Sequence, residues 1–256
     1  IHDGSIPSER LLNFVKQFQP GWTWTTPSFG WYLGETAKKA GIDPAKDLSI
    51  RNIIVSGEPG GAIRETRENI EQLWNANLYE YYGLSDIFGA CAGSCTEKSG
   101  IHIEEDHMIV EVLDLKTGEP VGEGERGEMV LTTLKKRARP LIRFRTGDIV
   151  TYTDEKCDCG RTHKRLHGIH GRTDDMLIIK GVNLFPSDVE AVVRGLDYLS
   201  GEYRLIVERE KHLDVLTIEV ENTKKKVPEV QNLVATAIKA RLGVSAHIVV
   251  HPEGTL

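Results

Sequence analysis

The stretch Tyr82-Gly83-Leu84-Ser85-Asp86 decides the fold when it is taken together with two later stretches. These are Phe144-Arg145-Thr146-Gly147-Asp148 and Gly171-Arg172-Thr173-Asp174-Asp175. Each stretch alone is a glycine-containing turn with an acidic residue, and such turns are common. The ordered set of three at these separations is far rarer, so we interpret the three stretches as parts of one architecture.

The residues around the first stretch alternate between predicted strands and helices. Residues 50–55 and 78–82 are rich in strand formers, and residues 62–75 between them carry apolar side chains at helical spacing. Another helix is predicted over Ser8–Phe18, with Ser8 as its N-cap. This order indicates an α/β layer with a mostly parallel sheet.

The pattern of predicted secondary structure changes twice further along the chain. Residues 102–150 contain short alternating segments between glycine-rich turns, which is typical of β-hairpins and small barrels. After Arg172 the predicted order is strand, helix, strand, strand, helix, strand, with the first helix opening at Pro186. We therefore expect a compact α+β lid after a boundary near residues 172–174.

The composition excludes several classes of protein. The net charge of −6 argues against a general nucleic-acid-binding surface, since such surfaces are basic. No run of about 18 apolar residues exists, so no membrane span is expected. Four cysteines in 256 residues do not form a disulfide scaffold, which favours a reducing, cytoplasmic location with thiols available for a metal.

The three stretches resemble the adenylate-forming enzymes, which activate carboxylic acids with ATP. Within that group they are similar to the phenylacetate–CoA ligases and the coenzyme F390 synthetase-like proteins. The resemblance runs from about Pro27 to the carboxyl terminus. It implies that residues 1–172 are part of the large AMP-binding domain and that residues 173–256 form a truncated lid domain. It is also compatible with a homodimer.

The resemblance implies a nucleotide site. Adenylation requires that adenine, ribose and the charge on phosphorus be held in place. Tyr82 would offer a ring face to adenine, and Gly83 would let the backbone approach the nucleotide. Ser85 would donate to a phosphate oxygen, Asp148 would accept both ribose hydroxyls, and the backbone of Ser56-Gly57-Glu58-Pro59 would line the base.

Further roles follow from the same resemblance. Asp86 would hold Mg²⁺ through a carboxylate oxygen, although the family usually has the longer glutamate there. Arg172 would contact ribose or phosphate at the domain junction, and Asp174 would be the hinge between two poses of the lid. Arg145 is open to two interpretations, a contact with a ligand phosphate or carboxylate and a structural ion pair.

A second group of candidate site residues consists of three cysteines and a histidine. Cys95 and His102 resemble a Cys-x6-His pattern of the same family, and Cys157 and Cys159 form a Cys-x-Cys hook. Three thiolates and one imidazole suit a structural, tetrahedral Zn²⁺ site. The alternative ligands are Cys91, His107 and His163.

The resemblance also implies that parts of the family's site lie outside this sequence. No Gly/Ser/Thr-rich phosphate loop is found in residues 1–80. The segment Pro252-Glu253-Gly254-Thr255-Leu256 ends where the family continues towards a catalytic lysine. We therefore expect a fragment that binds nucleotide weakly and does not catalyse adenylation by itself.

Three functional hypotheses remain. The first is an acid–thiol ligase that converts a carboxylic acid, of an aryl type like phenylacetate, to an acyl-adenylate and then to a CoA thioester. Its ligands would be the acid, ATP, Mg²⁺ and coenzyme A. The second is an F390 synthetase-like ligation to another acceptor. The third is a non-catalytic, zinc-stabilised nucleotide-binding module.

Overall fold

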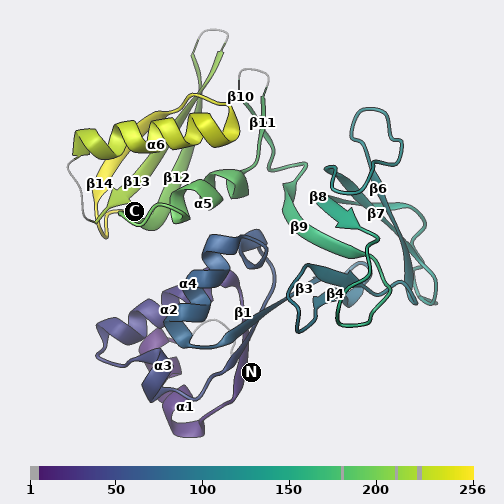
Figure 1. Cartoon of the computed structure of the whole chain (residues 1–256), viewed down its shortest axis with the longest axis horizontal. Coiled ribbons are helices and arrows are strands. Elements are labelled where there is room, and N and C mark those ends of the chain that lie inside the picture. Colours follow the sequence, from purple (N-terminus) through teal and green to yellow (C-terminus); the bar gives the residue numbers. More distant parts are fainter. Residues whose placement is uncertain (1–5, 180–181, 211–212, 224–226) are drawn as a thin grey trace. The chain divides into compact units, whose positions relative to one another are not determined.

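The computed structural model describes residues 6–179, 182–210, 213–223 and 227–256 (Figure 1). The chain divides into two compact units, Ile1–Ile169 and His170–Leu256. The predicted boundary after residue 172 lies three residues beyond this division. The division falls within one strand, β9 (Arg165–Arg172), which therefore belongs to both units.

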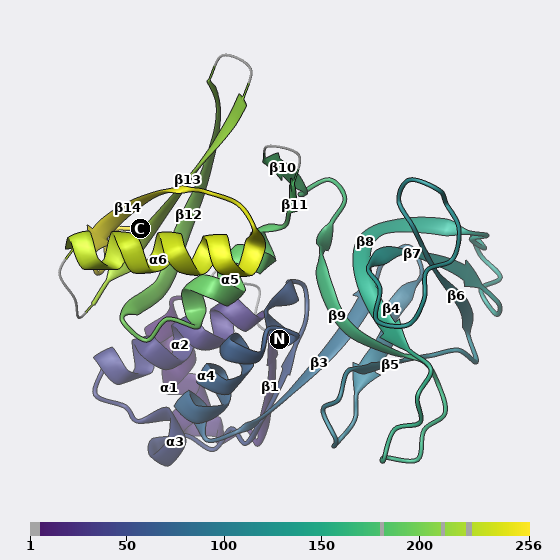
Figure 2. The same cartoon turned by 45° about the horizontal axis from the view of Figure 1, so that its top comes forward.

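Helices of the first unit lie on one side of strand β1 (Figure 2). The elements are α1 (Ser8–Phe18), β1 (Trp22–Thr25), α2 (Pro27–Lys39), α3 (Pro44–Asp47), β2 (Asn52–Val55), the short 3-10 helix η1 (Pro59–Gly61), α4 (Arg64–Trp74) and β3 (Asn77–Leu84). Strands β1, β2 and β3 pair in parallel. The α/β class is confirmed, but the parallel part of the sheet is limited to these strands in the described chain.

Local sequence explains where these helices begin. Proline occupies the first turn of α2 and α3, where the missing N–H has no intrahelical partner to lose. Thr26 and Asp43 precede these prolines, and their side chains accept hydrogen bonds from the first turn. The prediction that Ser8 caps α1 is wrong, because Pro7 holds the cap position and Ser8 is already helical.

Close contact between α2 and α4 fixes the helical layer. A Cβ at Gly34 would lie 2.4 Å from a methyl carbon of Leu73, so only glycine allows this approach. Trp74 is 1% exposed, and its Nε1 donates to the carbonyl of Gly30 at 3.0 Å. The buried indole therefore joins the two helices and satisfies its one polar group.

Strand β3 continues into an antiparallel region of the same sheet. The strand order is β1-β2-β3-β4-β5-β9-β8-β7-β6. The added strands are β4 (Phe88–Ser94), β5 (Ile101–Ile103), β6 (Met108–Leu113), β7 (Gly127–Thr133) and β8 (Phe144–Thr153), besides β9. Gly83 is required at the β3–β4 hairpin, because a Cβ there would lie 1.7 Å from the carbonyl oxygen of Gly89.

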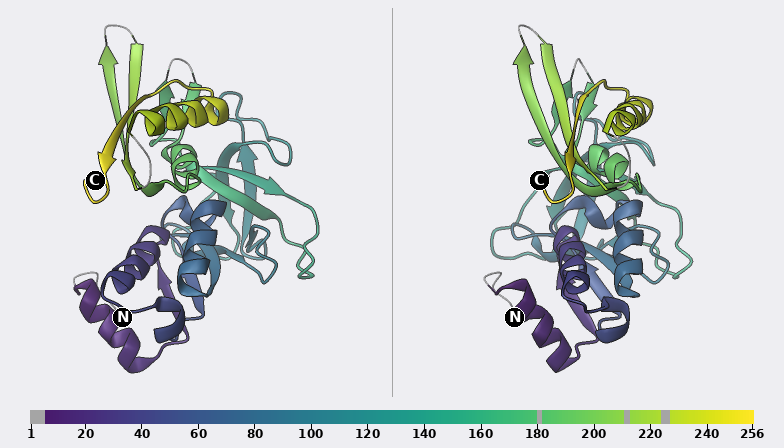
Figure 3. Two further views of the ribbon diagram at one scale, coloured as in Figure 1. Left: turned by 60° about the vertical axis from the view of Figure 1, so that its left-hand side comes forward. Right: turned by 90° about the vertical axis from the view of Figure 1, so that its left-hand side faces the viewer.

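The second unit has its own sheet and core. Its elements are β10 (Leu177–Ile179), β11 (Val182–Leu184), α5 (Pro186–Arg194), β12 (Leu199–Glu210), β13 (Leu213–Asn222), α6 (Val227–Leu242) and β14 (His247–Pro252). Helices α5 and α6 cover one face of the β12-β13-β14 sheet (Figure 3). Val189, Val193, Val230, Val234 and Ile238 are fully buried between the helices and the sheet.

The described part of the chain contains no helix that is both long and apolar enough to cross a membrane.

Candidate functional site

Tyr82 and Asp148 form a buried pair between β3 and β8. The phenol of Tyr82 donates to Oδ2 of Asp148 at 2.5 Å, and the two residues are 9% and 5% exposed. Burial and then the neighbouring Asp148 carboxylate raise the pKa of Tyr82 far above its usual range, so the phenol stays protonated. The hydroxyl of Thr146 accepts a hydrogen bond from the backbone N–H of Asp148 at 3.0 Å, which fixes the backbone at this residue.

The loop that follows β2 is held by side chains from β1 and α2. The indole Nε1 of Trp24 donates to the hydroxyl of Ser56 at 2.9 Å. The carboxylate of Glu58 accepts from the hydroxyl and the backbone N–H of Ser28, at 2.5 and 3.3 Å. Gly57 has a φ of +91°, a conformation that favours glycine. The predicted base-lining loop, Ser56–Pro59, therefore has a defined backbone shape.

A polar cavity of about 180 Å³ lies between α4, β3 and β9. Its walls include Ala62, Arg67, Glu80, Lys98 and His167. Burial raises the pKa of the Glu80 carboxyl to about 7, and the nearby guanidinium of Arg67 opposes the rise. A carboxyl group that is protonated near neutral pH can both donate and accept a hydrogen bond.

Glu80 was missed by the sequence analysis. It stands between Leu78 and Tyr82 at the positions of β3 that face inward. The signal was an acidic residue in the predicted strand 78–82, on the same face as Leu78 and Tyr82. Such residues are rarely buried without a reason, and perturbed groups in a cavity are candidates for a functional site.

The turn between β3 and β4 carries Ser85 and Asp86. The Asp86 carboxylate pairs with Arg139 at 3.6 Å, and the ammonium of Lys136 donates to the Asp86 carbonyl. Ser85 is exposed at the same turn. The predicted magnesium and phosphate residues therefore lie next to two cations. Arg145 forms an ion pair with the buried Glu128, which corresponds to the structural one of its two interpretations.

Arg172 and Asp174 belong to the second unit. The guanidinium of Arg172 donates to both carboxylate oxygens of Asp174, at 2.9 and 3.2 Å. This hydrogen bonding from Arg172 lowers the pKa of the Asp174 carboxyl, so the pair stays charged. Asp174, the predicted hinge residue, and Arg172, the predicted contact for ribose or phosphate, thus form a bidentate ion pair.

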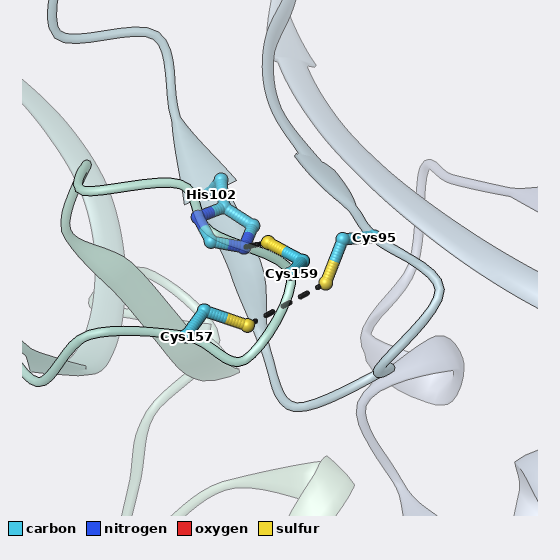
Figure 4. A group of neighbouring side chains, drawn as sticks. All are labelled: Cys95, His102, Cys157 and Cys159. Carbon is cyan, nitrogen blue, oxygen red and sulfur yellow. Dashed lines mark hydrogen bonds between the residues drawn. The ribbon is translucent and has the colours of Figure 1, made fainter.

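Cys95, His102, Cys157 and Cys159 come together although about sixty residues separate the two halves of the group (Figure 4). Their potential ligand atoms all lie within 4.8 Å of one another. The Sγ atoms of Cys95 and Cys157 are 3.7 Å apart, and Cys159 Sγ lies 3.4 Å from His102 Nε2. Hydrogen bonding from the backbone N–H of Cys159 is the main cause that lowers the pKa of Cys157 to about 7.

These distances fit a tetrahedral zinc site. Zinc binds thiolates at roughly 2.3 Å and imidazole at roughly 2.0 Å, which places neighbouring ligand atoms about 3.5–3.8 Å apart. The rival ligands Cys91, His107 and His163 are not part of this group in the described chain. The Cys91 thiol donates to the Phe88 carbonyl in the antiparallel core, His107 packs against the Phe88 ring, and His163 lies 3.9 Å from Asp106.

Comparisons with known proteins define the class. Residues 181–256 match the family model of the AMP-binding enzyme C-terminal domain. The whole chain superposes on 56% of a 2-hydroxyisobutyryl-CoA ligase, solved in a postadenylation state with an acyl-adenylate, with a TM-score of 0.90 and 27% identity. By sequence and by fold the chain is therefore similar to part of the adenylate-forming enzymes.

Within that class the chain is similar to phenylacetate–CoA ligases. It is 36% identical to the phenylacetate-coenzyme A ligase of Thermus thermophilus, over 96% of this chain and 60% of that protein. It is 33% identical to the corresponding Escherichia coli ligase, over 97% of this chain and 58% of that protein. The chain thus spans about three fifths of the length of these relatives.

Proposed function

We propose that this chain carries the nucleotide site and the lid of an AMP-forming acyl–CoA ligase. The observation that supports this most is the buried Asp148 carboxylate, which accepts a hydrogen bond from the Tyr82 hydroxyl. An oriented carboxylate can accept two hydroxyl groups at once, as the vicinal diol of a ribose requires.

The adenine would lie between Tyr82 and the Ser56–Pro59 loop. Glu80 is two residues from Tyr82 on the same face of β3 and borders the polar cavity. A carboxyl group in that place can accept a hydrogen bond from the exocyclic amine of the base and, when protonated, donate one to a ring nitrogen. The cavity would thereby distinguish adenine from bases without an amine at that position.

The phosphates would lie near the β3–β4 turn. Asp86 would hold Mg²⁺, which neutralises phosphate charge when bound. Binding of the metal requires that Asp86 exchange its contact with Arg139 for the ion, and this frees the guanidinium to meet a phosphate oxygen. Ser85 would donate its hydroxyl to the same phosphates, and Arg172 would be a further contact for ribose or phosphate.

The acid is converted in two steps under this proposal. Its carboxylate attacks the α-phosphorus of ATP and pyrophosphate leaves, and the thiol of coenzyme A then attacks the acyl carbon and AMP leaves. The 2-hydroxyisobutyryl-CoA ligase has been solved with an acyl-adenylate and with coenzyme A in the thioesterification state. Asp174 would be the hinge between the two steps, and opening its ion pair with Arg172 would accompany the movement.

Nucleotide binding tests the proposal on this chain. Titration calorimetry should detect AMP binding by the unchanged chain. The affinity for AMP should be at least tenfold lower in the Asp148→Asn variant. The control Asp106→Asn changes a carboxylate that is 74% exposed, and it should leave binding unchanged. Equal binding by both variants, or no binding of AMP at millimolar concentration by the unchanged chain, would contradict the proposal.

The acid and the acceptor are tested by the enzyme of which this chain is a part. The names of the relatives include both an arylacetic acid and a branched hydroxy acid, so the panel should contain both kinds. ATP–pyrophosphate exchange that depends on an aryl acid, followed by CoA-dependent thioester formation, is expected. Exchange without CoA dependence would favour the F390 synthetase-like alternative.

We further propose that Cys95, His102, Cys157 and Cys159 hold a structural zinc ion. All four protein ligands would occupy the tetrahedron, which leaves no open position for catalysis. Metal analysis should find about one zinc per chain and none in the double variant Cys157→Ser/Cys159→Ser. Cys91→Ser is the matched control and should keep its zinc, because the Cys91 thiol donates to a backbone carbonyl instead.

A further inference from the structure

One short segment of the first unit, residues 95–100, belongs both to the proposed metal site and to the polar cavity beside Glu80. This segment is named the zinc loop here. It begins at Cys95, one of the four candidate zinc ligands. Its other end forms part of the cavity wall through Lys98, Ser99 and Gly100. A change at the metal site can therefore reach the cavity within a few residues.

The zinc loop also packs against the segment that supplies the second pair of ligands. The buried guanidinium of Arg165 donates to the Ser99 carbonyl at 2.8 Å and to the Glu155 carbonyl at 3.0 Å. Glu155 precedes the ligand Cys157 by two residues. The Ser99 hydroxyl lies 3.7 Å from the Cys157 Sγ atom. The two halves of the metal site thus share contacts with the loop.

Helix α4 contacts the middle of the zinc loop. Arg67 donates to the Lys98 carbonyl at 3.1 Å, and the Lys98 ammonium donates to the Glu71 carboxylate at 2.6 Å. Lys98 has a φ of +53°, a conformation that a residue with a side chain keeps only where its surroundings hold it. Its backbone N–H donates to the Cys95 carbonyl at 3.1 Å. The position of Cys95 therefore helps to orient the carbonyl that Arg67 contacts.

Arg67 connects the zinc loop to the nucleotide side of the cavity. Its Nε and Nη2 atoms donate to the Gly61 carbonyl at 3.1 and 2.8 Å, in the short helix η1 that begins at Pro59 of the predicted base-lining loop. A Cβ at Gly61 would lie 2.9 Å from Cδ of Glu80, so these two residues are in close contact. The guanidinium charge also acts on the Glu80 carboxyl. One side chain thus joins Lys98, Gly61 and Glu80.

We propose that the zinc site positions the adenine site, and that Arg67 is the positioning residue that carries the coupling. This coupling rests on the metal and nucleotide functions proposed above. Zinc holds Cys95 and with it the zinc loop, the loop holds the guanidinium of Arg67, and the guanidinium holds Gly61 beside Glu80. Without the ion, the contact that remains between Cys95 and Cys157 is a weak thiol contact of 3.7 Å (Figure 4). Because coupling between two binding sites is reciprocal, bound nucleotide should also raise the affinity for zinc.

AMP affinity measured with and without zinc tests the coupling. The zinc-loaded chain is stripped with a chelator, and part of it is reloaded with zinc. Titration calorimetry should show an affinity for AMP that is about tenfold lower in the stripped chain and recovers on reloading. The Arg67→Gln variant should keep its zinc, and its affinity for AMP should be low whether or not zinc is bound.

Two further variants separate the connection made by Arg67 from its charge. Arg67→Lys keeps a positive charge near Glu80 but lacks the planar fork that bridges two carbonyl groups, so it should also lose the dependence on zinc. Arg64→Gln is the matched control in the same helix. The Arg64 side chain is 82% exposed and pairs with Glu68, so this variant should keep both its AMP affinity and the dependence on zinc.

Amide exchange gives a measurement that does not need the nucleotide. Removal of zinc should speed exchange at Lys98 and also at Ala62, whose N–H donates to the Pro59 carbonyl next to Gly61. In Arg67→Gln, exchange at Ala62 should be fast even with zinc bound. If the stripped chain unfolds, as circular dichroism would show, the zinc-loaded Arg67→Gln variant decides the question by its AMP affinity and its exchange at Ala62.

Three results would overturn the coupling. These are an AMP affinity that zinc removal leaves unchanged in a folded chain, an equal effect of zinc in Arg67→Gln and in the unchanged chain, and a chain that holds no zinc. The last result would leave the nucleotide proposal standing. A chain that binds zinc but no AMP would refute the nucleotide proposal instead, and exchange at Ala62 would then decide whether the two sites are coupled.

Discussion

Replacing Glu80 with glutamine should make the first unit more stable at alkaline pH and remove part of its pH dependence. Burial raises the pKa of this carboxyl from 4.5 to about 7, which corresponds to about 3 kcal/mol of unfavourable free energy once the group is ionised. Because the folded-state pKa is raised, stability is highest below pH 4.5, falls as the pH rises to about 7, and is level above that. Glutamine keeps the shape and cannot ionise.

Urea unfolding followed by tryptophan fluorescence measures this effect. All four tryptophans, at positions 22, 24, 31 and 74, lie in the first unit, so the signal reports that unit alone. The Glu80→Gln variant should match the unchanged chain at pH 4 and exceed its free energy of unfolding by about 3 kcal/mol at pH 8. Glu119→Gln, at an exposed position, is the control and should show no such trend. A difference for Glu80→Gln that stays constant from pH 4 to pH 8 would refute the reasoning.

Two other predictions concern stability and local order. Gly83→Ala should lower the free energy of unfolding of the first unit by on the order of 3 kcal/mol, because the added Cβ would meet the carbonyl oxygen of Gly89. Gly89→Ala is the control and should have a much smaller effect, because its Cβ would meet no atom within 4 Å. Equal losses of the free energy of unfolding in urea would contradict the close approach of the two backbones. Burial alone would raise the pKa of Glu221, but backbone N–H groups, that of Leu256 at 2.6 Å among them, hold it below its usual value. Glu221→Gln should therefore speed amide exchange at Leu256, and unchanged exchange would show that the carboxylate does not hold this turn.

Much of the local structure could be predicted from the sequence, because short-range signals dominate there. Helix α1 begins and ends at its predicted residues and helix α5 begins at its predicted residue, since apolar periodicity and proline at a first turn act within a few residues. The Ser8 cap was wrong because Pro7 takes that position, and the competition between two adjacent residues is decided by backbone geometry. The extent of the parallel sheet was also not predictable, because one strand, β3, pairs in parallel on one side and antiparallel on the other.

The candidate site shows the same division. The sequence by itself determined the class of protein, the nucleotide-site candidates and the four zinc-ligand candidates, because glycine, carboxylate and thiol positions carry chemistry that a pattern can reveal. Only the tertiary structure decided that Cys95 and His102 meet Cys157 and Cys159, that Tyr82 holds Asp148, and that Glu80 lines a cavity. The physical reason is that burial, and the pKa that follows from it, depend on residues brought together from distant parts of the chain.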